Sequence, residues 1–122
     1  MAEGELVPLV MLPRFSTYSG QTSFVTVAMD VTEYQNAILN VWRGPVTNAG
    51  TFKIFFEEST DQVTWSTCAG TSGTGEDPGD NTELQYTAQL KKRWFRVKIT
   101  IGASADASVT CWAVGFLEQR LS

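Results

Sequence analysis

The chain of 122 residues contains no histidine. This absence removes the side chain that most often transfers protons near neutral pH, and the commonest metal ligand. A Ser-His-Asp or Cys-His catalytic arrangement therefore cannot be built. The two cysteines, Cys68 and Cys111, are too few for a disulfide framework or a Cys-only zinc site. We expect reduced thiols, and a single bridge between them stays open because sequence separation does not fix their distance in the fold.

Long apolar runs and a positive net charge are also missing. No stretch approaches the roughly 18–20 apolar residues of a membrane span. The N-terminus does not resemble a signal peptide, because Glu3 and Glu5 stand where positive charge is needed and Pro8 interrupts the apolar run at 6–12. The 13 acidic residues outnumber the nine basic ones, which argues against a nucleic-acid packager. We therefore expect cytoplasmic synthesis, no membrane partner and no direct nucleic-acid partner.

The residues that are present favour strands. Four Trp, three Tyr and seven Phe occur with ten Gly, a composition typical of strands joined by turns. Apolar and polar residues alternate in most segments, the period of half-buried strands. In the first such segment, 24–32, Val25, Val27, Met29 and Val31 are predicted to share one face. No helix is convincing, and we predict one all-β domain, an antiparallel β-sandwich of about six to eight strands.

Residues 1–23 form a distinct segment. The run at 6–12 is apolar but contains Pro8 and is followed by Pro13, so an extended edge strand or arm is favoured over a helix. We predict an extended N-terminal arm over residues 1–23 and a β-sandwich domain over residues 24–122. Such an arm could lie on its own sandwich or add a strand to a neighbouring sheet edge.

Two acidic groups could suggest chemistry. The loop EDPGDN at 76–81 offers the oxygen ligands that calcium prefers, but its spacing fits no EF-hand, and a solvated loop is the simpler interpretation. Glu57 and Glu58 are adjacent in a predicted strand, so they point to opposite faces and cannot act together as a glycosidase pair. We interpret them as edge charges. The prediction is therefore a protein without catalytic residues, metal or cofactor.

Basic and aromatic residues suggest contact surfaces. The basic cluster at 91–98 admits three interpretations: a nucleic-acid patch, a charged turn with a solvent-facing strand, or a contact with the acidic loop of a neighbouring subunit. Trp42 and Trp94 project opposite the apolar faces of their strands and favour an interface, with a sugar-binding platform as the alternative. Trp65 and Trp112 are predicted to lie in the core. The predicted interface residues are Leu6, Val7, Leu9, Val10, Met11, Leu12, Trp42, Lys91, Lys92, Arg93 and Trp94.

Two motifs carry a family resemblance. One is an EES-D--TW hairpin, and the other is a late R(W/Y)-RV-(I/V)-I-G strand. The matching residues are Glu58, Ser59, Asp61 and Trp65 in the first, and Arg93, Trp94, Arg96, Val97 and Ile99 in the second. In this order of parts, which covers most of the chain, the sequence resembles the small, jelly-roll-like β-sandwich structural proteins of tailed bacteriophages.

The resemblance implies a capsid cement or decoration protein, without a catalytic role, on the exterior of a virion. The implied partners are the major capsid protein or other virion proteins, which it would bridge to stabilise the head. It also implies a homo-oligomer, with a trimer favoured, because such proteins often sit over a local symmetry axis. A tail, neck or fibre-associated protein is one alternative, and a carbohydrate-binding module for host-surface attachment is another.

Overall fold

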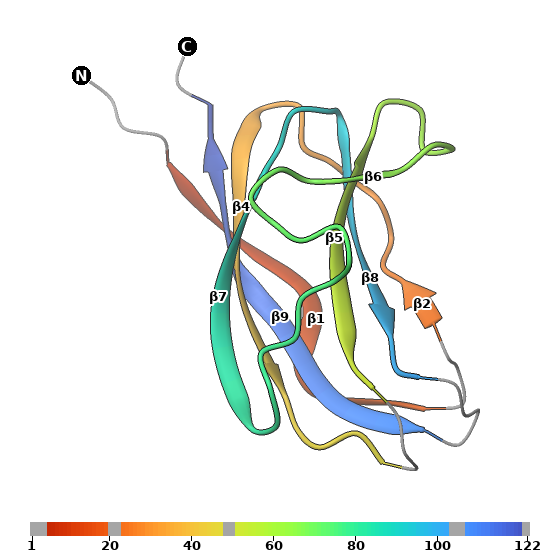
Figure 1. Ribbon diagram of the computed structural model, residues 1–122. Helices are drawn as coiled ribbons and strands as arrows, with labels where there is room; N and C mark the ends of the chain where they lie inside the picture. The colour runs from red at the N-terminus through yellow and green to blue at the C-terminus, as the bar shows by residue number, and fades with distance from the viewer. Residues whose placement is uncertain (1–4, 20–22, 48–50, 103–106, 121–122) are drawn as a thin grey trace.

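The computed structural model describes residues 5–19, 23–47, 51–102 and 107–120. In these ranges the chain is all-β, with two antiparallel sheets and a core between them (Figure 1). The strands are β1 (Leu6–Ser19), β2 (Ser23–Val25), β3 (Met29–Asp30), β4 (Tyr34–Arg43), β5 (Lys53–Ser59), β6 (Ser66–Thr67), β7 (Thr82–Gln89), β8 (Trp94–Thr100) and β9 (Ser108–Gln119). The predicted all-β class is confirmed. The described part of the chain has no helix long and apolar enough to cross a membrane.

The two sheets have different strand orders. The four-stranded sheet runs β1-β9-β4-β7, and the five-stranded sheet runs β2-β8-β5-β6, with β3 also paired to β8. Alternating apolar residues on the inner faces fill the space between them, as the sequence predicts. The largest fully buried side chains are Phe52, Phe56, Phe95, Leu39, Ile54, Leu90, Ile99, Ile101, Val31, Val41, Val97 and Val109. Burying each such side chain is worth roughly 1.5–3 kcal/mol, which makes this core the main source of stability.

The N-terminal segment is a strand of its own sheet. β1 pairs with β9 from its first residue, Leu6, to its last, Ser19. Leu9, Met11 and Leu12 face the core and are 4, 9 and 3% exposed. Their burial explains why this apolar stretch lies on its own chain, and a separate arm is not confirmed. Residues 1–4 and 20–22 of the predicted arm lie outside the described residues.

The predicted strand at 24–32 is interrupted. Between β2 and β3, residues 26–28 hold one more residue than the facing stretch of β8, which makes a β-bulge. The extra residue reverses which side chains face the core. Val25 and Val27 are 47 and 85% exposed, whereas Val31 is fully buried and Met29 packs against the core. The prediction that all four share one face is therefore wrong for Val25 and Val27.

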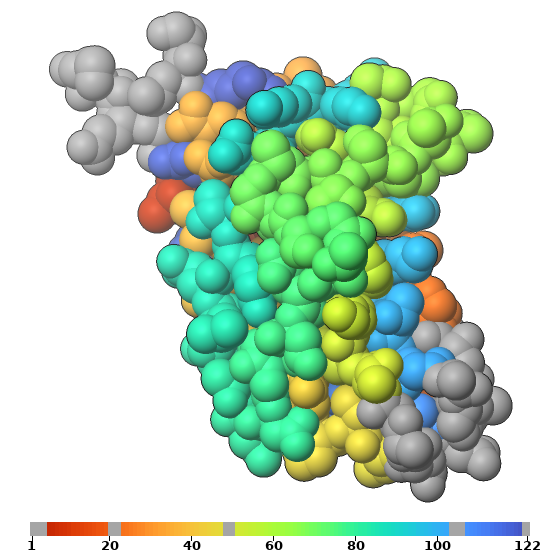
Figure 2. Space-filling model, in the orientation of Figure 1, coloured from red at the N-terminus to blue at the C-terminus, as the bar shows by residue number. Residues whose placement is uncertain are grey.

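Different features close the two open sides of the sandwich. The connection between β6 and β7 crosses from one sheet to the other, and isolated bridges join Glu76 to Ile54 and Ala69 to Gln89. Figure 2 shows this connection, in green, spread over the side between β7 and β5. On the other side, β1 and β2 are joined by the stacked rings of Tyr18 and Phe24.

Candidate interaction surface

The basic cluster at 91–98 is engaged within the chain, on the five-stranded sheet. Arg96 Nε donates to Glu57 Oε1 at 2.9 Å, and its guanidinium lies 4.1 Å from the centre of the Trp65 ring. Arg93 pairs with Asp30 at 3.1 Å and lies over the neighbouring Trp94 ring. Each of these cations therefore already has an acidic and an aromatic neighbour.

Glu58 organises the turn that carries the lysines of this cluster. Its carboxylate is 4% exposed and accepts the backbone N–H groups of Lys91 and Lys92 at 2.8 and 3.2 Å. Lys92 Nζ donates in turn to Ser66 Oγ. Glu57 pairs with Arg96 on the other face of β5, so the predicted divergence of Glu57 and Glu58 is confirmed. The edge-charge interpretation is wrong for both residues, because β5 is paired with β8 and with β6 at these positions. Glu58 is in addition buried and holds a turn.

The acidic loop is tied to β4 by a buried arginine. Arg43 is 8% exposed, and its Nε donates to Asp77 Oδ1 at 2.7 Å while its Nη1 pairs with Asp80. Burial raises the pKa of Asp77, but hydrogen bonds from Arg43 and from the Gly79 N–H outweigh it and hold that pKa below its ordinary value. The loop is therefore anchored. Among the described residues, no three His, Cys, Asp or Glu side chains form a metal-binding group.

The sequence does not single out Arg43, although the structure makes it the anchor of this loop. It lies 34 residues before Asp77, and only the fold brings the two together. Its one local signal is its position in β4, where alternation with Val41 directs it toward the interior. A charged residue at a core-facing position requires a partner, and the acidic loop supplies it.

The outer face of the four-stranded sheet carries several exposed apolar side chains. The strand registers arrange its outward residues in rows that run from β1 to β7. The rows are Leu6, Glu118, Asn36 and Gln89; then Pro8, Phe116, Ile38 and Thr87; then Val10, Val114, Asn40 and Gln85; and last Arg14 with Phe15, Trp112, Trp42 and Glu83. The β1 and β9 columns are mostly apolar, and the β7 column is polar.

We call Leu6, Pro8, Val10, Val114 and Phe116 the apolar strip. Leu6, Val10 and Phe116 are 53, 60 and 41% exposed. A shallow hollow of about 480 Å³ lies along the strip and reaches Arg14 and Asn40. Contiguous exposed apolar surface of this kind is typical of contact sites.

An aromatic cluster adjoins the apolar strip. Trp42 and Trp112 stack across β4 and β9 with ring centres 4.5 Å apart, and Phe15 meets Trp112 edge-on at 5.2 Å. The Arg14 guanidinium also lies 5.6 Å from the Trp112 ring. The predicted core position of Trp112 is wrong, because the strict alternation of β9 places Cys111 inward and therefore Trp112 outward.

Phe15 sits on a bulge with unusual backbone geometry. β1 gains residues relative to β9 between Leu12 and Ser16, so the segment 13–15 stands opposite Trp112. Phe15 adopts a φ of 63°, in the left-handed region that bulky residues rarely enter. Its side chain is 81% exposed. A strained backbone that presents an apolar ring to solvent points to a function for that ring.

The free edge of β1 is poorly suited to strand addition. Gln119 N–H donates to Glu5 O at 2.9 Å, and this bond sets the hydrogen-bonding phase of β1 against β9. By that phase, the backbone polar groups of Leu6, Pro8 and Val10 point away from β9. Pro8 has no N–H, so the outward row lacks a donor at its centre. The outer face is therefore a better contact surface than the edge.

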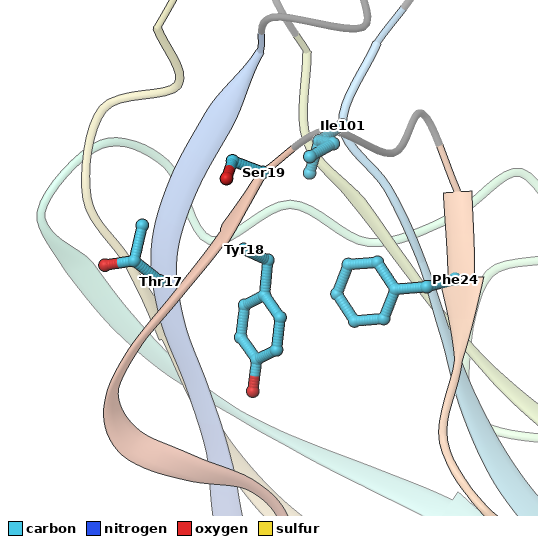
Figure 3. Close-up of a pocket in the computed structure, with 5 residues that line it drawn as sticks. All are labelled: Thr17, Tyr18, Ser19, Phe24 and Ile101. Atoms are coloured by element: carbon cyan, nitrogen blue, oxygen red, sulfur yellow. The ribbon is translucent and has the colours of Figure 1, made fainter.

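A small pocket lies at the seam between β1 and β2. It is lined by Thr17, Tyr18, Ser19, Phe24 and Ile101. In Figure 3 the rings of Tyr18 and Phe24 lie side by side across it, and Thr17 points away. None of the described residues that line it is charged, and burial raises the pKa of Tyr18, so its hydroxyl stays protonated near neutral pH.

The two cysteines are free and buried. Burial raises the pKa of both thiols, that of Cys111 to about 12. Neither is therefore a thiolate at neutral pH, and neither is a ready nucleophile.

The predicted contact residues separate into three groups in the structure. Leu9, Met11 and Leu12 belong to the chain's own core, and Val7 packs against it. Leu6, Val10 and Trp42 come together on the outer face of the four-stranded sheet. Lys91, Lys92, Arg93 and Trp94 lie apart from them, at the start of β8 in the five-stranded sheet and in the turn before it.

The chain has no recognisable relative in the comparisons. No protein-family model, no curated protein and no solved structure matches it.

Proposed function

We propose that the protein is a non-enzymatic structural component of a bacteriophage particle, a cement or decoration protein on the capsid exterior. The observation that carries this proposal is the apolar strip. It is exposed beside Phe15, whose backbone is strained, on a chain in which Arg93 and Arg96 of the basic cluster are already paired with acidic residues. Apolar surface of this kind, rimmed by polar side chains, gains free energy when a partner covers it. The motif resemblance supplies the proposed partners, the major capsid protein or other virion proteins.

Strand order supports the finer proposal of a jelly roll. If β2 and β3 are counted as one strand interrupted by the bulge at 26–28, the described residues form eight strands in two sheets. Renumbered on that basis, the sheets run 1-8-3-6 and 2-7-4-5. This interleaving is the order of a jelly roll built from two Greek keys.

The absence of enzymatic activity is part of the proposal. The chain has no histidine, and its thiols are buried. Glu57 and Glu58, the adjacent carboxylates, point to opposite faces and are engaged by Arg96 and by a backbone turn. These groups serve the fold, which leaves contact as the better supported role.

Two further roles remain as second candidates. The aromatic cluster favours a carbohydrate-binding module, because Asn40, Gln85 and Glu83 provide polar groups beside Trp42. Against it, Trp42 and Trp112 stack on each other, which occupies a ring face of each. Binding to a glycan array that is lost in Trp42→Ala would support this role. A tail, neck or fibre position would instead appear as rings or tubes of the purified chain in electron micrographs.

The test of the proposed function uses particles of the phage that encodes the chain. Phe116→Lys places a charge in the apolar strip and should exclude the protein from purified particles. Val63→Lys is the matched control, because Val63 is 80% exposed in the loop between β5 and β6, and it should be incorporated normally. Particles that lack the protein should release DNA at lower temperature. Wild-type protein missing from the particles would refute the proposal.

A further inference from the structure

We infer that the neighbour covering the apolar strip is a second copy of this chain, packed outer face to outer face about a two-fold axis. This inference rests on the proposed function, since it names the partner of the same surface. A two-fold contact requires a self-complementary patch, in which residue i meets residue j and j meets i. The apolar strip has this property.

The axis crosses the strands between the Pro8–Phe116 row and the Val10–Val114 row. Rotation about it keeps each column over the same column of the partner and reverses the order of the rows. Pro8 then faces Val10 of the second copy, and Phe116 faces Val114. The polar β7 column meets itself as well. Every side chain of the apolar strip is therefore covered by an apolar one, and the β7 column by polar ones. In the β4 column, Ile38 lies over Asn40 and Trp42 over Asn36.

The charges agree with the same arrangement. Arg14 has no carboxylate partner in the described part of the chain and lies over Trp112. The two-fold axis brings it to the row of Leu6 and Glu118 in the second copy, one strand away from Glu118. That carboxylate accepts one hydrogen bond, from Asn36 Nδ2 at 2.7 Å, and can accept more. Because facing sheets lie about 10 Å apart, these two long side chains can meet. The symmetry makes this ion pair twice.

Other arrangements of two copies are less favourable. A two-fold axis parallel to the strands would place Val10 over Gln85 and Val114 over Asn40, covering polar amides with apolar side chains. Pairing along the free edge of β1 is opposed by Pro8. The antiparallel face-to-face contact leaves that edge unused and keeps each residue of the apolar strip over an apolar side chain.

Phe15 has a defined place in this contact. It lies in the last row, which the axis brings over the Leu6 row of the second copy. The bulge raises its ring at the border of the strip, where an aromatic anchor contributes most when it is desolvated. The left-handed backbone of Phe15 is then explained by the contact that it serves.

The experiment measures the mass of the full chain in solution by sedimentation velocity, over a range of concentrations. The wild-type chain should be a dimer. Arg14→Glu and Glu118→Arg should each weaken it about tenfold or more, because each places like charges opposite one another. The double variant should recover most of the loss, since the pair is restored with reversed sign. Lys91→Glu makes the same charge change as Arg14→Glu, but it lies away from the outer face of the four-stranded sheet. It should therefore leave the dimer intact.

Circular dichroism on each variant separates lost association from lost folding. Phe116→Lys should be a folded monomer. The inference fails if the wild-type chain is monomeric, if it is a trimer, or if the double variant associates no better than the single ones. A monomeric wild type in which Phe116→Lys still prevents incorporation into particles would refute the dimer and leave the proposed function standing. A dimer of the expected kind that is absent from particles would do the reverse.

Discussion

The outer faces of the two sheets differ in whether their side chains already have partners within the chain. On the five-stranded sheet, Arg96 is paired with Glu57 and stacked on Trp65, and Lys98 lies over Phe55. On the four-stranded sheet, the apolar strip and Phe15 face solvent. Basic and aromatic residues side by side in the sequence suggest a contact site. In the fold, Arg93 and Arg96 are paired with acidic residues and lie over aromatic rings. The apolar surface free for a partner lies on the other sheet.

The energetic consequence follows from desolvation. Covering the five-stranded face would remove water from ion pairs that are already made, and this costs free energy without forming new pairs. Covering the four-stranded face removes water from exposed apolar side chains, and this gains roughly 25 cal/mol for each Å². Substitutions on the two faces should therefore separate stability from association.

Gly115→Ala should have the largest effect on stability, because it disrupts the pairing of β9 with β4 inside the four-stranded sheet. An added Cβ at Gly115 would lie 1.9 Å from the carbonyl oxygen of Ile38, so β9 and β4 would have to separate. We expect a loss of about 3 kcal/mol in the free energy of unfolding, measured by urea titration. Gly73→Ala is the control, since its added Cβ would contact only Thr67 Oγ1, at 3.7 Å. Equal stability of both variants would contradict the close approach.

Removing both carboxylates that hold Arg43 should rank second and leave association intact. In Asp77→Ala/Asp80→Ala the buried guanidinium loses both carboxylate partners and keeps its hydrogen bond to the Gly44 carbonyl. We expect a cost of about 2 kcal/mol at pH 7, less than for a fully buried pair because the Asp77 and Asp80 side chains are 37 and 63% exposed. Urea titration at pH 7 measures this loss. Asp30→Ala is the control, because it breaks a pair with the exposed Arg93 and should cost less.

The stability contributed by the ion pairs of Arg43 with Asp77 and Asp80 should depend on pH. The pKa of Asp77 is lower in the folded chain than its ordinary value of 3.8. Its contribution is therefore fully present above that value and is lost as the pH falls through the lower, folded pKa. The gap in stability between wild type and the double variant should narrow below about pH 4. An unchanged gap at pH 2.5 would contradict this assignment.

Arg96→Ala, on the five-stranded sheet, should lower stability without changing self-association. It removes the ion pair with Glu57, whose side chain is 15% exposed, and the cation–π contact with Trp65. We expect a loss of about 1.5 kcal/mol in thermal or chemical unfolding. Self-association should not change. A double-mutant cycle with Glu57→Gln isolates the ion pair, and weaker association in Arg96→Ala would show that this face also makes contacts.

Phe15→Asn should have the smallest effect on stability. Asparagine enters the left-handed region more readily than phenylalanine, so relief of backbone strain should offset the lost contact with Trp112. We expect a change within about 0.5 kcal/mol in the free energy of unfolding, together with weaker self-association by sedimentation. Val63→Asn, another exposed apolar position, should leave both quantities unchanged. A loss above about 2 kcal/mol would assign Phe15 a structural role instead.

Alternation predicted the inner faces of the strands, because a strand with one buried side imposes a period of two. It fails at the bulges at 26–28 and 13–15, where one or two extra residues change the phase without a mark in the sequence. Arg43 and its aspartates could not be paired from sequence, since only the fold joins them. The apolar strip was predicted in part, because Leu6 and Val10 are among the predicted interface residues. Phe116 is not, because β9 is apolar on both faces.

Pro8 has a consequence for how copies of the chain can associate. An open strand edge invites pairing with further copies and unlimited growth into fibres. Pro8 has no backbone N–H, so it interrupts the hydrogen-bonding edge of β1 in the middle of its apolar residues. The chain can thus expose an apolar face for a closed contact without also forming open-ended edge-to-edge polymers.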